Sequence, residues 1–146
     1  VQGVQLARQR QTELASQRLR QAIEQYDAVL GNGNLMSTLN EPVLLELEMK
    51  AGQVEDAVSS INEIENKLLA CLNEDHDRVL QLDRLRSIHF ELTNRHSKQL
   101  EFLERFLTRA EQILDPWDSR IEEARTAREM ALRHFAQSNR RKTADH

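Results

Sequence analysis

An apolar repeat with alternating steps of three and four residues reads LDRLRSIHFELTNRHSKQLEFLERFLTRAEQIL over residues 82–114. Side chains three and four positions apart lie on the same side of an α-helix, so this spacing predicts an amphipathic helix. The positions on its apolar face are Leu82, Leu85, His89, Leu92, His96, Gln99, Leu103, Phe106, Ala110 and Ile113. Such a narrow stripe is typical of a coiled-coil-like seam between long helices.

Two segments before this repeat carry the same spacing. A helix of roughly residues 4–30 is expected first, and Gly31-Asn32-Gly33-Asn34 ends it because glycine and asparagine accept positive φ. Asn40-Glu41-Pro42 then predicts a helix start, with Asn40 as the N-cap. The seam that follows contains Leu47, Ala51, Val54, Val58, Ile61, Leu68 and Leu72. Gly52 lies within this seam and predicts either close backbone packing or a slight bend.

The connection between the second and third seams is open to two interpretations. The polar run Asn73–Asp77 predicts either a turn or the solvent face of one continuous helix over residues 41–114. The apolar phase changes at this run, which fits a turn and equally a coiled-coil stutter.

The final helix has the clearest start signal. Asp115-Pro116-Trp117-Asp118 places an aspartate at the expected N-cap and a proline at the first helical position. Residues 138–146 contain one alanine among polar residues, so we expect a frayed tail. The expected organisation is one helical-bundle domain over residues 1–137 and this tail.

The composition supports an all-α fold. Only four glycines and two prolines occur in 146 residues, whereas strands joined by tight turns need many more. Charged residues make up 30% of the chain and aromatic residues 4%. We therefore expect an elongated antiparallel bundle of three or four long helices with coiled-coil-like seams.

Charge and hydropathy argue against several classes of partner. The formal net charge of −4 gives no electrostatic footprint for nucleic acid. The longest apolar run, Leu68–Leu72, has five residues, whereas a membrane span needs about 20, so no membrane insertion within this chain is expected. The single cysteine favours a reducing compartment, so we expect a cytoplasmic protein, or a periplasmic one if the chain is part of a receptor.

Acidic residues are concentrated in one region. Residues 41–77 hold ten Asp and Glu against two Lys, a formal net charge of −8. This segment is expected to pair with its mildly basic neighbours, or else the acids form a solvated helix face.

The motifs of common catalytic and cofactor sites are absent from the sequence. Gly31 and Gly33 are not followed by Gly-Lys-Ser/Thr, and there is no Cys-x-x-Cys, His-Glu-x-x-His or Gly-x-Ser-x-Gly. No histidine has a glutamate three positions earlier, as a di-iron bundle requires. We therefore expect no enzyme, no cofactor and no metal site.

His89 and His96 are the candidate interaction or pH-sensitive residues. Both occupy seam positions among leucines, one heptad apart. A partly buried histidine bonded to a facing acid such as Glu65 is one interpretation, and a pH-sensitive or register-setting seam is the other. Burial without an acid would lower the histidine pKa, and a facing glutamate would raise it.

Trp117, the sole tryptophan, is the third candidate. We expect it to anchor the start of the last helix in the core. The alternative is an exposed hot spot for a partner.

Long helices with seams of three-four spacing, scarce glycine and a lone tryptophan near a helix start resemble the pattern of a spectrin-type three-helix repeat. The resemblance is one of pattern only, and it implies a scaffold role.

Three functions fit these features. The preferred one is a non-catalytic protein–protein interaction or scaffold module that binds a protein partner or forms a homo-oligomer through helix faces. The alternatives are a four-helix sensory or ligand-binding domain of a membrane receptor and a helical export chaperone.

Overall fold

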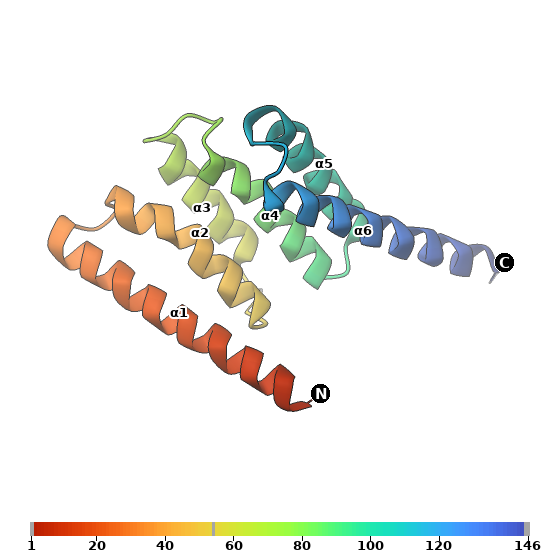
Figure 1. The fold of residues 1–146 in the computed structure, drawn as a ribbon, viewed down its shortest axis with the longest axis horizontal. Helices are drawn as coiled ribbons and strands as arrows, with labels where there is room; N and C mark the ends of the chain where they lie inside the picture. The colour runs from red at the N-terminus through yellow and green to blue at the C-terminus, as the bar shows by residue number, and fades with distance from the viewer. Residues whose placement is uncertain (1, 54, 145–146) are drawn as a thin grey trace. The chain divides into compact units, whose positions relative to one another are not determined.

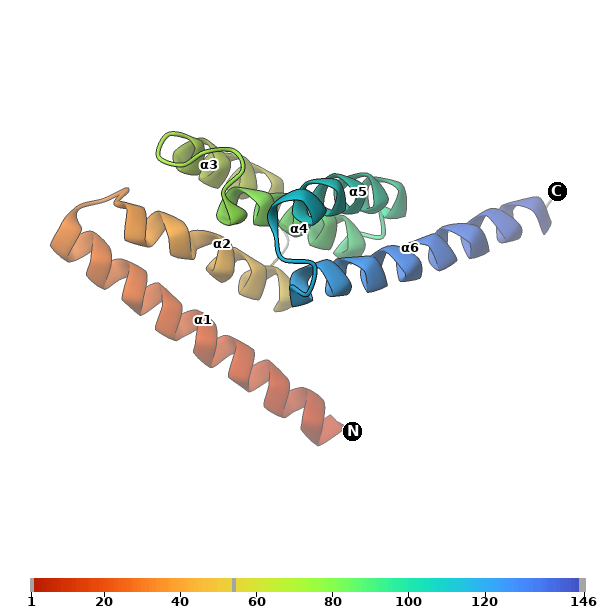
Figure 2. The ribbon, with the colours of Figure 1, turned by 45° about the horizontal axis from the view of Figure 1, so that its top comes forward.

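The computed structural model describes residues 2–53 and 55–144, and over these residues it contains helices and no strand (Figures 1 and 2). The helices are α1 (Gln2–Leu30), α2 (Leu35–Lys50), α3 (Ala57–Leu69), α4 (Asp77–Leu92), α5 (His96–Ile113) and α6 (Ser119–Ala144). The all-α prediction is confirmed. The expected count of three or four long helices is wrong, because two seams that read as continuous are each interrupted.

The chain forms two compact units that divide between Asn73 and Glu74. Unit 1 contains α1, α2 and α3, and unit 2 contains α4, α5 and α6. Within each unit the helices that are consecutive in sequence pack on each other, α1 on α2 and α2 on α3, then α4 on α5 and α5 on α6. Figure 1 shows that these neighbours run antiparallel. Whether residues 1–137 behave as a single domain stays a prediction.

The first turn confirms the break expected after Leu30. Gly31 and Gly33 have φ values of 90° and 75°. The amide of Ser37 donates to Asn34 Oδ1 over 2.9 Å, so Asn34 caps α2. The start predicted at Asn40-Glu41-Pro42 is therefore wrong, and Pro42 lies buried inside α2.

Two interruptions share one hydrogen-bonding pattern at the helix end. At the end of α2, Gly52 has φ 93°, and the amide of Gln53 donates to the Glu48 carbonyl over 3.0 Å. At the end of α4, Asn94 has φ 59°, and the amide of Arg95 donates to the Phe90 carbonyl over 2.8 Å. This six-to-one bond with a left-handed residue is the Schellman motif. Gly52 therefore ends a helix, and neither close packing nor a slight bend accounts for it.

The remaining connections agree with the sequence in outline. A turn separates α3 from α4, which decides against one helix over residues 41–114. α6 begins at Ser119, and the amide of Arg120 donates to Asp118 Oδ1 over 3.0 Å. Asp118 is thus the cap, whereas the cap was predicted at Asp115. α6 continues to Ala144, and residues 145–146 of the expected tail lie outside the described residues.

Each unit has its own buried apolar residues. Those of unit 1 include Leu45, Met49, Ala57, Ile61, Ile64 and Leu68. The cluster of unit 2 contains Leu80, Leu103, Phe106, Leu107, Ala110, Ile121 and Ala124. Ile61 and Leu68 of the second predicted seam are buried, but Val58 is exposed, and Val54 lies outside the described residues.

None of the helices, over the residues that were placed, combines the length and apolar character needed to cross a membrane.

Candidate functional site

His89 and His96 lie on different helices. His89 is in the last turn of α4, and His96 is the first residue of α5. The expectation that they share one helix a heptad apart is wrong, because Asn94 ends α4 between them. No common seam joins the two side chains.

The His89 ring is partly buried and packs edge-on against Phe90, with the ring centroids 5.2 Å apart. Its Nδ1 is buried and accepts or donates no hydrogen bond within the described part of the chain. Burial lowers the pKa of His89, and the positive charge of Arg95 lowers it further. His89 therefore favours the neutral form.

His96 packs face to face with His134 of α6, with ring centroids 5.2 Å apart and an angle of 12° between the rings. His96 Nδ1 lies 3.2 Å from Oε1 of the buried Gln99. The two histidines line a hollow of about 190 Å³ with Glu91 and Met130. Across residues 2–53 and 55–144, no three His, Cys, Asp or Glu side chains are grouped to hold a metal ion.

Trp117 does not anchor the core. Its side chain is 92% exposed in the turn between α5 and α6, so the expectation of a buried anchor is wrong. The amide of Trp117 donates to Asp115 Oδ1 over 3.1 Å, and this local turn holds residue 117 outside the helix.

A buried carboxylate of unit 2 was not identified from the sequence. The Asp83 side chain is 3% exposed, and its Oδ1 accepts from Arg86 Nη1 over 3.1 Å. Its Oδ2 makes no hydrogen bond to a described residue, but Arg105 and Arg109 bring guanidinium nitrogens within 3.9 and 3.8 Å. Arg86 and Arg105 also lie over the Phe102 ring. The arginines compensate the charge of the buried Asp83 carboxylate, which points to a structural role.

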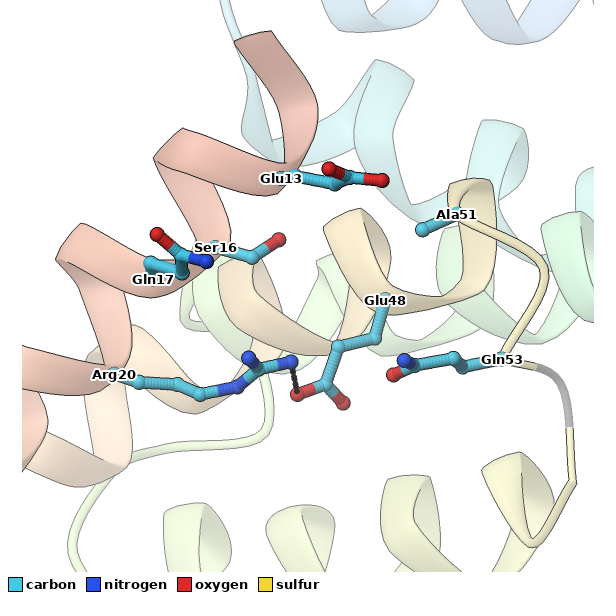
Figure 3. A pocket seen from close by; sticks show the side chains of 7 residues that line it. All are labelled: Glu13, Ser16, Gln17, Arg20, Glu48, Ala51 and Gln53. Carbon is cyan, nitrogen blue, oxygen red and sulfur yellow. Dashed lines mark hydrogen bonds and ion pairs between the residues drawn. The ribbon is translucent and has the colours of Figure 1, made fainter. Parts of the chain in front are cut away.

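Unit 1 holds a polar hollow between α1 and α2, shown in Figure 3, with a volume of about 210 Å³. α1 contributes Glu13, Gln17 and Arg20, and α2 contributes Glu48. Arg20 Nη2 lies 3.2 Å from Glu48 Oε1. Glu13 makes no ion pair with another residue that the structure describes, so the hollow has an excess of negative charge.

A second hollow lies between α2 and α3, with a volume of about 220 Å³. We name it the acidic groove, and its lining residues are Glu41, Leu44, Leu45, Glu48, Ser60, Glu63, Ile64 and Lys67. Positions 41, 44, 45 and 48 share one face of α2, and positions 60, 63, 64 and 67 share one face of α3, because side chains three and four apart are neighbours on a helix. Two facing stripes therefore build the groove.

The groove combines an apolar floor with a mainly acidic rim. Leu45 and Ile64 are buried. Glu41 is paired with Lys67, whose Nζ lies 3.4 Å from Glu41 Oε1. Glu63 forms no ion pair among the described residues. Glu48 lines both hollows, so the two form adjoining parts of one acidic surface.

This surface can bind and orient a cationic group. Its four glutamates outnumber the two bases Arg20 and Lys67, and apolar side chains lie beneath the groove. Apolar floors with charged rims are typical of grooves that accept amphipathic segments. The sequence did show the acidic excess of residues 41–77, but the grouping of Glu41, Glu48 and Glu63 requires the break at Gly52, which was not predicted.

Comparisons of the chain with protein-family models, with curated proteins and with solved structures gave no match.

Proposed function

We propose that this protein is a non-catalytic protein–protein interaction or scaffold module, and that unit 1 binds a basic amphipathic segment of a protein partner. The observation that carries the proposal is the pair of hollows beside α2, which share Glu48 and hold more carboxylates than cations. A partner with lysine or arginine beside apolar residues complements both the rim and the floor.

The mode of binding that fits this surface is a helix laid in a groove. The partner's apolar side chains would lie on Leu44, Leu45 and Ile64, and its cations would face Glu48 and Glu63. Exposed ion pairs contribute little affinity each, about 0.2 to 1 kcal/mol, so the floor supplies affinity and the rim supplies orientation and association rate.

We also propose that both units are scaffolds for partner binding and that the protein is cytoplasmic. Each unit is an antiparallel helical bundle whose outer helix faces are available to partners. The single cysteine favours a reducing compartment and hence the cytoplasm.

Fluorescence anisotropy of a labelled 18-residue helix of leucine and lysine, titrated with the full chain, tests the proposal. We expect saturable binding that weakens as salt rises from 0.05 to 0.5 M, because rim charges are screened. The same helix with glutamate in place of lysine should not bind.

The decisive variant is Glu48→Gln/Glu63→Gln, which removes two rim charges. It should weaken binding about tenfold, whereas the matched variant Glu24→Gln/Glu55→Gln, outside both hollows, should bind as the wild type does. Equal loss in both variants would mean that net charge alone attracts the peptide, and the proposal would be wrong.

A sensory or ligand-binding domain is the second candidate, favoured by the hollow that His96 and His134 line. The stacked imidazoles of His96 and His134 at the edge of this hollow suit a small polar ligand such as a carboxylate. Histidine ring signals in an NMR titration with small carboxylic acids would report such a ligand, and unchanged signals would rule out this class.

A further inference from the structure

α6 extends beyond the part of it that is buried. Ala131 is its last buried residue, and the side chains of residues 132–141, which we name the α6 overhang, are all exposed. Figure 1 shows this end of α6 running past α5. Leu132 and Phe135 are 50% and 42% exposed.

The overhang continues the apolar stripe of α6. Ile121, Ala124 and Ala131 are buried on one face, and Phe135 follows Ala131 by four residues, so it lies on the same face. Leu132 lies beside this stripe. An apolar face therefore continues onto a helix segment whose side chains remain open to solvent.

The charge of this helix end is opposite to that of the acidic groove. Residues 130–144 contain four Lys and Arg and no Asp or Glu. The groove between α2 and α3 contains three glutamates and one lysine. The chain thus carries both a basic amphipathic helix and an acidic groove with an apolar floor.

The dimensions also agree. The groove has a volume of about 220 Å³. An enclosed apolar cavity of about 150 Å³ accepts a benzene molecule, so the open groove is large enough in volume for the ring of Phe135.

We propose that the α6 overhang of one copy docks in the acidic groove of a second copy of this chain. The inference rests on the proposed function, because it names the occupant of the same groove. Each copy would offer one overhang and one groove, so the contact joins two unlike surfaces. Two copies can exchange overhangs in a closed dimer, and successive contacts can also extend into open chains.

Sedimentation velocity of the full chain, over increasing concentrations and at 0.05 and 0.5 M salt, tests this inference. We expect the average mass to rise with concentration to that of a dimer or beyond it, and to fall with salt, whereas a constant monomer mass would overturn the inference. The overhang variant Leu132→Glu/Phe135→Glu and the groove variant Glu48→Lys/Glu63→Lys should each associate at least about tenfold more weakly.

Two matched controls carry the same chemical changes elsewhere. Leu14→Glu/Val29→Glu replaces exposed apolar residues of α1, and Glu24→Lys/Glu55→Lys reverses acids outside the groove. Both should associate as the wild type does, and circular dichroism should show every variant folded. Loss of association in the α1 control would place the contact on α1 and overturn the inference.

Mixing provides the sharpest result. The overhang variant keeps an intact groove, and the groove variant keeps an intact overhang. Together they should form a heterodimer although neither variant associates well alone, because each pair contains one intact overhang and one intact groove. Failure of the mixture to associate, when the wild type does, would contradict docking of the overhang in the groove.

The leucine–lysine peptide separates this inference from the proposed function. If that peptide binds the groove while the wild type stays monomeric at all concentrations, the second copy is the wrong occupant and the proposed function stands. Tighter peptide binding by a monomeric overhang variant would show that the overhang occupies its own chain's groove. If neither peptide nor overhang binds, both proposals fail.

Discussion

Units 1 and 2 have the same local plan, three helices of which consecutive ones pack, but they place ionised side chains differently. Unit 1 keeps Glu13, Glu48 and Glu63 at the rims of open hollows. Unit 2 buries Asp83 beneath three arginines. A carboxylate at a rim remains available to a partner, whereas one enclosed by guanidinium groups is committed to the fold.

The largest expected change in unfolding free energy comes from truncating a core residue, and it tests whether the two units unfold separately. Leu103 of unit 2 and Met49 of unit 1 are both fully buried, and truncating either to alanine should cost about 3 kcal/mol of unfolding free energy. Urea unfolding followed by circular dichroism measures it. If residues 1–137 are one domain, both variants shift a single transition. Two transitions, each moved by one variant, would contradict that prediction.

A smaller change in unfolding free energy tests the contrast between the buried carboxylate of Asp83 and the rim carboxylate of Glu63. Asp83→Asn keeps the shape but removes the negative charge that Asp83 presents to the three arginines. Breaking a buried pair costs about 3 kcal/mol, and we expect no more than this here because Arg105 is more than half exposed. Glu63→Gln, at the groove rim, should change the unfolding free energy by less than about 0.5 kcal/mol. Equal costs measured by urea unfolding would remove the distinction between the units.

The smallest effect concerns His89. Its folded pKa is lowered by burial and then by Arg95, so the unfolded chain, with a histidine pKa of about 6.5, takes up the proton first as the pH falls. Its contribution to stability is thus complete above pH 6.5 and decreases as the pH falls from there toward the folded pKa, by at most about 1.4 kcal/mol per pH unit. Melting at pH 7.5 and 5.5 should show a smaller acid loss in His89→Leu than in the wild type.

Arg95→Gln sharpens this test because it removes the positive charge that lowers the pKa of His89 and leaves His89 as buried as before. The pKa of His89, followed by NMR, should then rise part of the way toward its ordinary value. A pKa unchanged by Arg95→Gln, together with equal acid losses in wild type and His89→Leu, would show that this residue does not sense pH.

The all-α class and the first turn could be predicted from sequence, because periodicity and glycine turn signals are local. Gly31 and Gly33 adopt positive φ in a tetrapeptide with no competing apolar pattern. Gly52 and Asn94 lie within apolar repeats. The repeats predict that the helix continues, whereas each of these residues alone is only a weak signal of a helix end. Only the Schellman bonds, which depend on how the following residues fold back, distinguish a helix end from a tolerated interior residue.

The candidate site was predictable in charge but not in position. The acidic excess of residues 41–77 was visible, but the facing of Glu48 and Glu63 depends on the reversal between α2 and α3. Asp83 is surrounded by arginines from α4 and α5, and Arg105 and Arg109 come close to it only because Asn94 reverses the chain.

The exposed indole of Trp117 has a spectroscopic consequence. The only tryptophan is already in water when the protein is folded, so its emission maximum should barely move on unfolding, and the helix signal is the better reporter of stability. The same fluorophore can report any tryptophan-free molecule that covers the turn between α5 and α6. A blue shift on mixing would identify that turn as a contact surface without any label.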